Sequence, residues 1–306
     1  MKLLQLYLPL IALVSLGFMG GKLSPIIPLY LGQFLFWVGV PLSIMAFLRQ
    51  ADLSGAIWVA AMFAWMAIFF GAGLAWVWIN WQTDKKNVLT SWQRPTQGSF
   101  ILAAMAGNTG YLGYPVTLAF VGTQYFGYAL FYDLLGTSLG VWGLGVAIAA
   151  VYGDGVQSQW QLVKAIAINP SLWGFGVGLL LRQVPLPTIV ETILNTLGWA
   201  IVALSLVLIG MRLRQLNSWH SLPKASISLS IKMLVVPLLL GSILSWFGVT
   251  GATRLAIVLQ MAMPPAFATL VIAEVYDLDR DLSVTALALG SGGLLVTLPI
   301  WLWLFS

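Results

Sequence analysis

Polar side chains that could bind a small molecule occur beside prolines in two long apolar stretches of the chain. The residues expected to contact a ligand are Asn108, Thr109, Gly110, Tyr111, Pro115, Gln260, Met263, Pro264 and Pro265. Proline removes a backbone donor and clashes with the carbonyl four residues earlier, so it interrupts a helix and frees that carbonyl. Pro115 would free the carbonyl of Tyr111, and Pro264 and Pro265 would free those of Gln260 and Met261.

Freed backbone groups at membrane depth are tolerated only where they are buried in protein or line a water-filled cavity. A single break would be explained well enough as a packing kink. Two breaks in corresponding halves of the chain, one of them beside Asn108 and Thr109, instead predict a binding site. The half-helix N-termini beyond Pro115 and Pro265 would present amides and a positive dipole end to an anion.

Two ionisable residues, Asp133 and Lys232, fall inside other apolar stretches. Asp133 lies about 12 Å into a hydrocarbon layer about 30 Å thick, so we expect it to face the interior or a cavity. Gly136 and Gly140 share its helical face and would let another helix approach closely. Lys232, about 9 Å deep, either snorkels to the surface or turns inward. If Lys232 turns inward, Asp133 could serve as a coupling-ion site and Lys232 as the counter-charge for an anion.

The composition is that of an integral membrane protein. The chain has 306 residues, of which 60% are hydrophobic and 8% are charged. A net charge of +5 fits basic loops at a membrane surface, so no nucleic-acid partner is expected. The chain has no cysteine, and His220 is the only histidine, so no metal site, cofactor or catalytic dyad is expected and the protein is predicted not to be an enzyme.

Ten apolar stretches are long enough to be membrane helices, and their continuous hydrophobicity predicts an all-α fold. They cover residues 3–20, 25–48, 54–81, 99–121, 125–152, 164–182, 187–211, 226–247, 252–275 and 282–305. Basic residues divide 9 to 4 between alternate loops, with Lys232 left inside a stretch. The positive-inside rule then predicts a multi-pass protein of the plasma (inner) membrane with both termini outside the cytoplasm.

The two halves of the chain resemble each other. Pro9 and Pro170 lie near the starts of the first and sixth stretches, and Leu-Arg-Gln follows the second and seventh. Five spans in each half require opposite orientations in the membrane. The sequence therefore predicts an inverted repeat, with residues 1–152 and 164–306 as its units.

Four short segments together are similar to the auxin efflux carrier family in its prokaryotic form. They are Asn108-Thr109-Gly110-Tyr111-Leu112-Gly113-Tyr114-Pro115, Met263-Pro264-Pro265-Ala266, Leu130-Phe131-Tyr132-Asp133-Leu134 and Thr297-Leu298-Pro299. The resemblance implies ten transmembrane helices in a five-plus-five inverted repeat like that of bile acid/sodium symporters. Spans 1, 2, 6 and 7 would form a scaffold, and spans 3–5 and 8–10 a transport bundle. Broken helices four and nine would cross within that bundle.

By position, Asn108 and Pro115 match the first crossover of the family, and Pro264 and Pro265 match the second. The resemblance implies a secondary transporter that exports a small organic anion, such as an auxin-like weak acid or a carboxylate, by a rocking or elevator motion. Unlike plant members, the chain has a short loop near 153–164 and no carboxylate in the third span. Regulation through that loop is therefore not expected, and the absent carboxylate argues against auxin itself and against a proton site copied from plants.

Other readings of the sequence stay open. A sodium- or proton-coupled importer would use the same fold, and the sequence leaves open a proton or sodium ion as coupling partner and a homodimer as the assembly. A membrane-embedded enzyme would need a second catalytic group facing Asp133, and no such spacing occurs. A membrane sensor or scaffold would be marked by an appended signalling domain, for which the length leaves no room.

Overall fold

The computed structural model describes residues 12–21, 26–55, 57–83, 92–153, 168, 170–214 and 221–306, and every regular element within them is helical. Six of these helical segments are long and apolar enough to cross a membrane. They are Ile27–Leu48, Trp58–Gln82, Thr123–Tyr152, Thr188–Met211, Leu222–Phe247 and Arg280–Phe305. The expected all-α class is thus confirmed. His220 and most of the loop near 153–164 lie outside the described residues.

The other four of the ten expected spans have identifiable reasons for not being among these six. The stretches 99–121 and 252–275 are each interrupted in the middle, so neither forms one long helix. The stretches 3–20 and 164–182 begin outside the described residues. Their described later parts, 12–20 and α10 (Pro170–Arg182), are helical.

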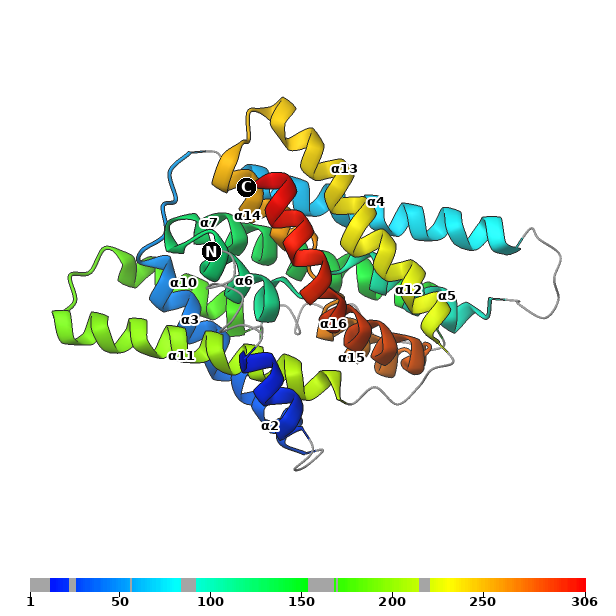
Figure 1. Cartoon of the computed structure of the whole chain (residues 1–306), viewed down its shortest axis with the longest axis horizontal. Helices are drawn as coiled ribbons and strands as arrows, with labels where there is room; N and C mark the ends of the chain where they lie inside the picture. Colours follow the sequence, from blue (N-terminus) through cyan, green and yellow to red (C-terminus); the bar gives the residue numbers. More distant parts are fainter. Residues whose placement is uncertain are drawn as a thin grey trace.

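One group of helices consists of α2 (Ile27–Phe34), α3 (Val40–Leu48), α10 and α11 (Thr188–Leu213), with α3 packed against both α10 and α11 (Figure 1). A Cβ at Gly174 would lie 2.7 Å from Pro41 Cα, so a glycine is needed for α10 to approach α3. Arg49, at the end of α3, forms an ion pair with Glu191 of α11 at 2.8 Å.

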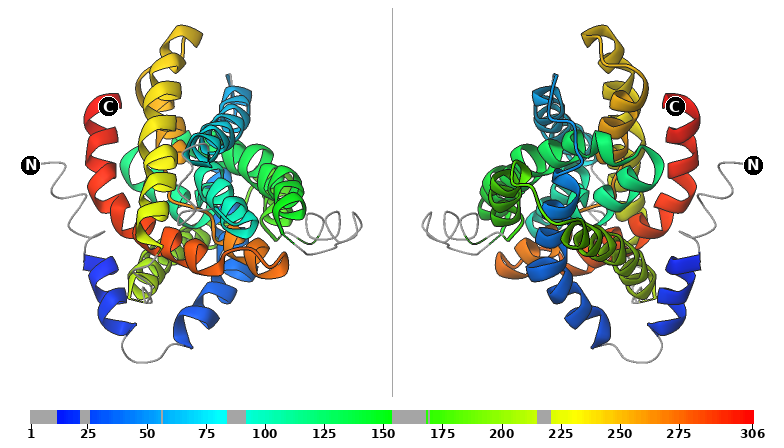
Figure 2. Two further views of the ribbon diagram at one scale, coloured as in Figure 1. Left: turned by 90° about the vertical axis from the view of Figure 1, so that its right-hand side faces the viewer. Right: turned by 90° about the vertical axis from the view of Figure 1, so that its left-hand side faces the viewer.

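A second group contains the interrupted helices and the helices packed around them. Its members are α4 (Trp58–Thr83), α5 (Arg94–Met105), α7 (Phe126–Phe131), α8 (Val146–Tyr152), α12 (Leu222–Ser230), α13 (Val236–Ile243), α14 (Gly251–Met261), α15 (Phe267–Val275) and α16 (Arg280–Phe305). Helix α12 packs on α5 and α16, as the yellow and red ribbons of Figure 2 show for α12 and α16. The predicted close approach beside Asp133 is present, because Cβ atoms at Gly136 and Gly140 would lie 2.1 Å and 2.5 Å from Ala64 and Ile68 of α4.

Candidate substrate-binding site at the crossing of two broken helices

The two interrupted helices meet at their breaks. Helix α5 ends at Met105, and a second helical segment begins with the π-helical turn Thr109–Gly113 and continues as α6 (Tyr114–Phe120). Helix α14 ends at Met261, and α15 begins at Phe267.

The extended residues between these half-helices pair in antiparallel fashion, with Gly107 opposite Pro265. The Asn108 amide donates to the Pro264 carbonyl at 2.7 Å, and the Ala266 amide donates to the Ala106 carbonyl at 3.0 Å. The breaks are therefore joined through main-chain atoms.

Lys232 turns inward and lies behind this crossing. Its side chain is 1% exposed, and Nζ donates to the Met261 carbonyl at 2.9 Å. This carbonyl is one of those that the proline pair deprives of a helical donor. A Cβ on Gly107 would lie 3.2 Å from Lys232 Nζ, so the ammonium group is held between both breaks.

Asp133 lies on the opposite side of the first break and is 6% exposed. Its carboxylate accepts hydrogen bonds from the Thr109 hydroxyl and from Tyr114 Oη, the latter at 2.6 Å, and it is also hydrogen-bonded to the Ser138 side chain. Thr109 and Tyr114 belong to the half-helix that starts after the break. The π-helical turn Tyr132–Ser138 supplies Asp133 and Ser138 together.

A cavity of about 360 Å³ lies beside Asp133 and reaches the first residues of both later half-helices. Its opposite wall comes from α2 and the π-helical turn Leu35–Gly39 that follows it. The residues that line it are Leu29, Gly32, Gln33, Phe36, Trp37, Val40, Gly107, Asn108, Thr109, Gly110, Tyr111, Asp133, Thr137, Ser138, Val141, Trp142, Ser171, Ala266, Phe267, Ala268 and Val271. Among these described residues, Asp133 is the sole carboxylate and none is basic.

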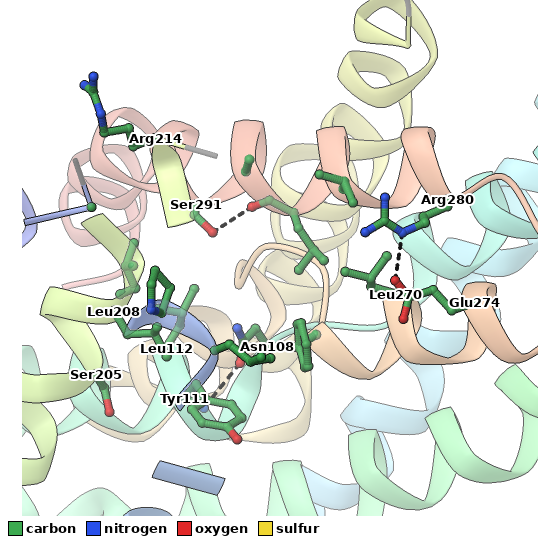
Figure 3. A pocket seen from close by; sticks show the side chains of 18 of the residues that line it. Asn108, Tyr111, Leu112, Ser205, Leu208, Arg214, Leu270, Glu274, Arg280 and Ser291 are labelled. Atoms are coloured by element: carbon green, nitrogen blue, oxygen red, sulfur yellow. Dashed lines mark hydrogen bonds and ion pairs between the residues drawn. The ribbon is translucent and has the colours of Figure 1, made fainter. Parts of the chain in front are cut away.

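A larger cavity, of about 1060 Å³, adjoins the first and shares Leu29, Asn108, Tyr111 and Phe267 with it. We call this larger space the vestibule. Figure 3 shows Asn108, Tyr111 and Leu112 gathered at one end of the vestibule, with Arg214 and Arg280 at a distance from them.

The two arginines that line the vestibule each contact another side chain. Arg280 forms an ion pair with Glu274 at 2.8 Å, and the Arg214 guanidinium lies 5.2 Å from the centroid of the Phe18 ring. Asp281 also lines this cavity. The vestibule thus joins a charged rim to the smaller cavity, with Asn108 and Tyr111 at the junction.

The expected ligand-binding residues divide into two sets. Asn108, Thr109, Gly110, Tyr111 and Asp133 line the smaller cavity. The remaining ones lie in the packed crossing behind it and line neither cavity, namely Pro115, Lys232, Gln260, Met263, Pro264 and Pro265.

Gln260 is a clear case of a polar residue used for packing. It is fully buried, its amide donates to Thr117 at 3.0 Å, and a Cβ on Gly113 would lie 2.2 Å from its Oε1 atom. Gln260 therefore fastens the first half-helix to the second and does not face the smaller cavity.

Several lining residues were not anticipated. Gln33, Trp37 and Ser171 reach the cavity from α2, the adjoining π-helical turn and α10. In the sequence, only the polar side chains of Gln33 and Ser171 could have marked these positions as part of a binding site. Most residues around both positions are apolar, so no periodicity indicates which face is buried.

Asn108 combines a structural and a contact role, and its replacement by alanine tests both. Its side chain accepts a hydrogen bond from the Tyr111 amide at 3.3 Å, which caps the half-helix. Loss of such a cap costs about 1 kcal/mol. Because the side chain also lines both cavities, we expect Asn108→Ala to reduce transport about tenfold, equivalent to about 1.4 kcal/mol, in a flux assay.

The matched control is Asn195→Ala. Asn195 is half-buried, accepts a hydrogen bond from Gln50 at 3.2 Å and lines neither cavity. Equal losses of transport in the two variants would contradict the assignment of Asn108 to the site.

The comparisons with known proteins identify the family. The chain matches the family model described as membrane transport protein over residues 3–302. It is similar to a protein of Methanothermobacter thermautotrophicus named "Uncharacterized transporter", with 30% identity over 267 residues, which cover 86% of this chain and 84% of the relative. A second protein with that description, from Methanocaldococcus jannaschii, is 26% identical over 212 residues, which cover 68% of each chain. The chain therefore belongs to this family of membrane transport proteins, the auxin efflux carrier family that its proline segments indicated.

Proposed function

We propose that the protein is a secondary transporter that moves a small organic anion, such as an auxin-like weak acid or a carboxylate, out of the cytoplasm by alternating access. The observation that carries the proposal is the antiparallel crossing, which brings the N-termini of two half-helices to one cavity. Each N-terminus carries about half a positive charge, and such ends favour anions.

The chemistry of the smaller cavity supports a substrate with both an apolar body and a polar group. Aromatic rings from Phe36, Trp37, Trp142 and Phe267 line it, and polar groups gather around Asn108. Small-molecule sites commonly combine mostly apolar walls with a few polar groups that fix orientation. An organic acid with one carboxylate and a ring or short alkyl chain fits this lining.

The position of the vestibule supports loading from the cytoplasm. Arg214 and Arg280 line it, and both belong to the loops that the positive-inside rule assigns to the cytoplasmic side. We therefore take this conformation to be open to the cytoplasm, with both chain termini on the other side. Export would then require the smaller cavity to open to the opposite side.

Two helix groups provide parts that could move against each other. We assign α2, α3, α10 and α11, with the first span, to a scaffold, and the helices around the crossing to a transport bundle. The smaller cavity lies between α2 and the crossing, where these groups face one another. Units 1–152 and 164–306 would be the two halves of the inverted repeat.

Flux measurements in liposomes test the proposal. The purified full chain, reconstituted with internal unlabelled benzoate, should accumulate external labelled benzoate by exchange faster than protein-free liposomes do. Asn108→Ala should reduce this rate. If correctly folded protein exchanges neither benzoate nor any other weak organic acid of a broad panel, the proposed function is wrong.

A further inference from the structure

The smaller cavity has a nearly balanced local charge before any substrate enters. The half-helices that begin at Thr109 and Phe267 each contribute about +0.5 at their N-termini, or about +1 together. Asp133 stands at the first of these termini, within 3.3 Å of a Cβ built on Gly110. The negative charge of its carboxylate is therefore already stabilised by the two helix N-termini before a substrate anion binds.

The charge behind the crossing is balanced separately. Helices α5 and α14 end there, and their C-termini contribute about −1 together. Lys232 supplies +1 at this point, bonded to the Met261 carbonyl and packed on Gly107. Lys232 lines neither cavity, so its charge is engaged behind the crossing and does not contact an anion in front of it.

No other described group is placed to neutralise Asp133. Of the elements packed against its helical turn, α4 and the turn Val141–Gly145 carry no titratable side chain. Helix α7 carries Tyr128, and the half-helix from Thr109 carries Tyr111, whose hydroxyl donates to the Gly32 carbonyl, and Tyr114, whose hydroxyl donates to Asp133 itself. Helix α14 carries Arg254, whose guanidinium lies 4.9 Å from the centroid of the Phe305 ring.

We propose, on the basis of the function proposed above, that Asp133 takes up one proton when the cavity binds its substrate, so that the protein carries a monovalent organic anion together with one proton. An anion entering beside an ionised Asp133 would place two negative charges against about one positive charge in a water-poor site. One proton on Asp133 restores the balance.

The step is a simple protonation. A proton from water in the vestibule binds a carboxylate oxygen of Asp133, which becomes a carboxylic acid and donates one hydrogen bond where it earlier only accepted them. The Thr109, Tyr114 and Ser138 hydroxyls can also accept hydrogen bonds, so they can adapt to the neutral acid. The anion and the proton cross together with zero net charge, and both are released on the far side.

Proton uptake on binding tests the proposal in detergent, where no membrane leak interferes. The purified full chain is mixed with benzoate, a monoanion, or, at pH 7 and above, with phthalate, the matched dianion. A pH indicator in weak buffer reports protons taken up, and a labelled acid reports binding. The measurements run from about pH 5 to about pH 8, above the usual pKa of a carboxyl group.

We expect the wild-type protein to take up about one proton per benzoate bound, and its Kd for benzoate to rise towards about tenfold per pH unit at the alkaline end. Phthalate should bind at least tenfold more weakly than benzoate. Asp133→Asn, which mimics the neutral acid, should bind benzoate with no proton uptake and with a Kd that does not change with pH.

Asp52→Asn is the matched control. Asp52 lies in an exposed loop outside both cavities, and hydrogen bonds from the Ser54 side chain and amide hold its pKa below the usual value. The carboxylate therefore stays ionised across the tested range, and the control should behave as the wild type does.

The outcomes separate the two proposals. If neither benzoate nor any other weak organic acid of the panel binds the wild-type protein at any pH tested, the function proposed for this cavity is wrong. If benzoate binds without proton uptake, or if sodium replaces the proton in a sodium-against-choline comparison, only the coupling to Asp133 is overturned. Should Asp133→Asn fail to fold, the proton count and the benzoate-to-phthalate preference of the wild type still decide the matter.

Discussion

Lys232→Met will reduce transport about a hundredfold, equivalent to about 2.7 kcal/mol. The methionine side chain fills a similar volume but neither donates to the Met261 carbonyl nor balances the C-termini of α5 and α14. A buried carbonyl left without its donor costs about 1–3 kcal/mol. The crossing is therefore expected to lose the geometry that holds the two N-termini at one cavity.

The stability of the protein should change less than its transport. Removing the buried ammonium also removes the cost of keeping that charge out of water, which offsets the loss of the hydrogen bond. We expect the thermal midpoint of Lys232→Met to stay within several degrees of the wild type, while exchange in liposomes falls. A variant that exchanges benzoate at more than half the wild-type rate would contradict this role of Lys232.

One further variant separates charge from hydrogen bonding, and a second is its control. Lys232→Gln keeps a donor for the Met261 carbonyl but loses the charge, and we expect it to remain at least tenfold impaired. Lys224→Met is the control, because Lys224 lies 5.1 Å from the centroid of the Trp92 ring and lines neither cavity. Full recovery in Lys232→Gln would show that the hydrogen bond alone is required.

Gly71→Ala is expected to destabilise the protein strongly. A Cβ at Gly71 of α4 would lie 2.4 Å from the carbonyl oxygen of Ala104, in the last turn of α5 before the break. Ala104 is fully buried, and the obstacle is backbone, which cannot rotate away. Overpacking of this kind costs about 3 kcal/mol, so the thermal midpoint should fall sharply and α5 should be displaced from α4.

Gly73→Ala is the matched control on the same helix. A Cβ at Gly73 meets no atom within 4 Å. Alanine is favoured over glycine in a helix interior by about 1 kcal/mol, so this variant should be as stable as the wild type or slightly more so. Similar thermal midpoints for the two variants would show that α4 and α5 are not in the close contact described.

The second break was predictable because its cause is local: proline removes a helical hydrogen bond, and Pro264 and Pro265 lie between the end of α14 and the start of α15. The first break lies at residues 106–108, and Pro115 lies inside the half-helix that follows. The prediction that this half-helix begins beyond Pro115 was therefore wrong. The partner of each break is not a local property. The pairing of Gly107 with Pro265 depends on residues more than 150 positions apart, and only the repeated order of segments in the two halves pointed to it.

The direction of buried polar side chains was harder to predict. Lys232 could snorkel or turn inward, and the outcome depends on the Met261 carbonyl and the space beside Gly107, both of which belong to other helices. Gln260 was expected to face a ligand, and it packs on Gly113 because that glycine leaves room for it. In a uniformly apolar helix, one polar residue does not reveal which neighbour receives it.

The two breaks are joined directly to each other by main-chain hydrogen bonds, between Asn108 and Pro264 and between Ala266 and Ala106. The geometry of this joint is therefore largely independent of the side chains that project from it into the cavity. Selectivity could be redesigned by exchanging Thr109, Tyr111 or Phe267 while the frame stays intact. Because different atoms would set the geometry of the crossing and the choice of substrate, related transporters would acquire new substrates through a few substitutions.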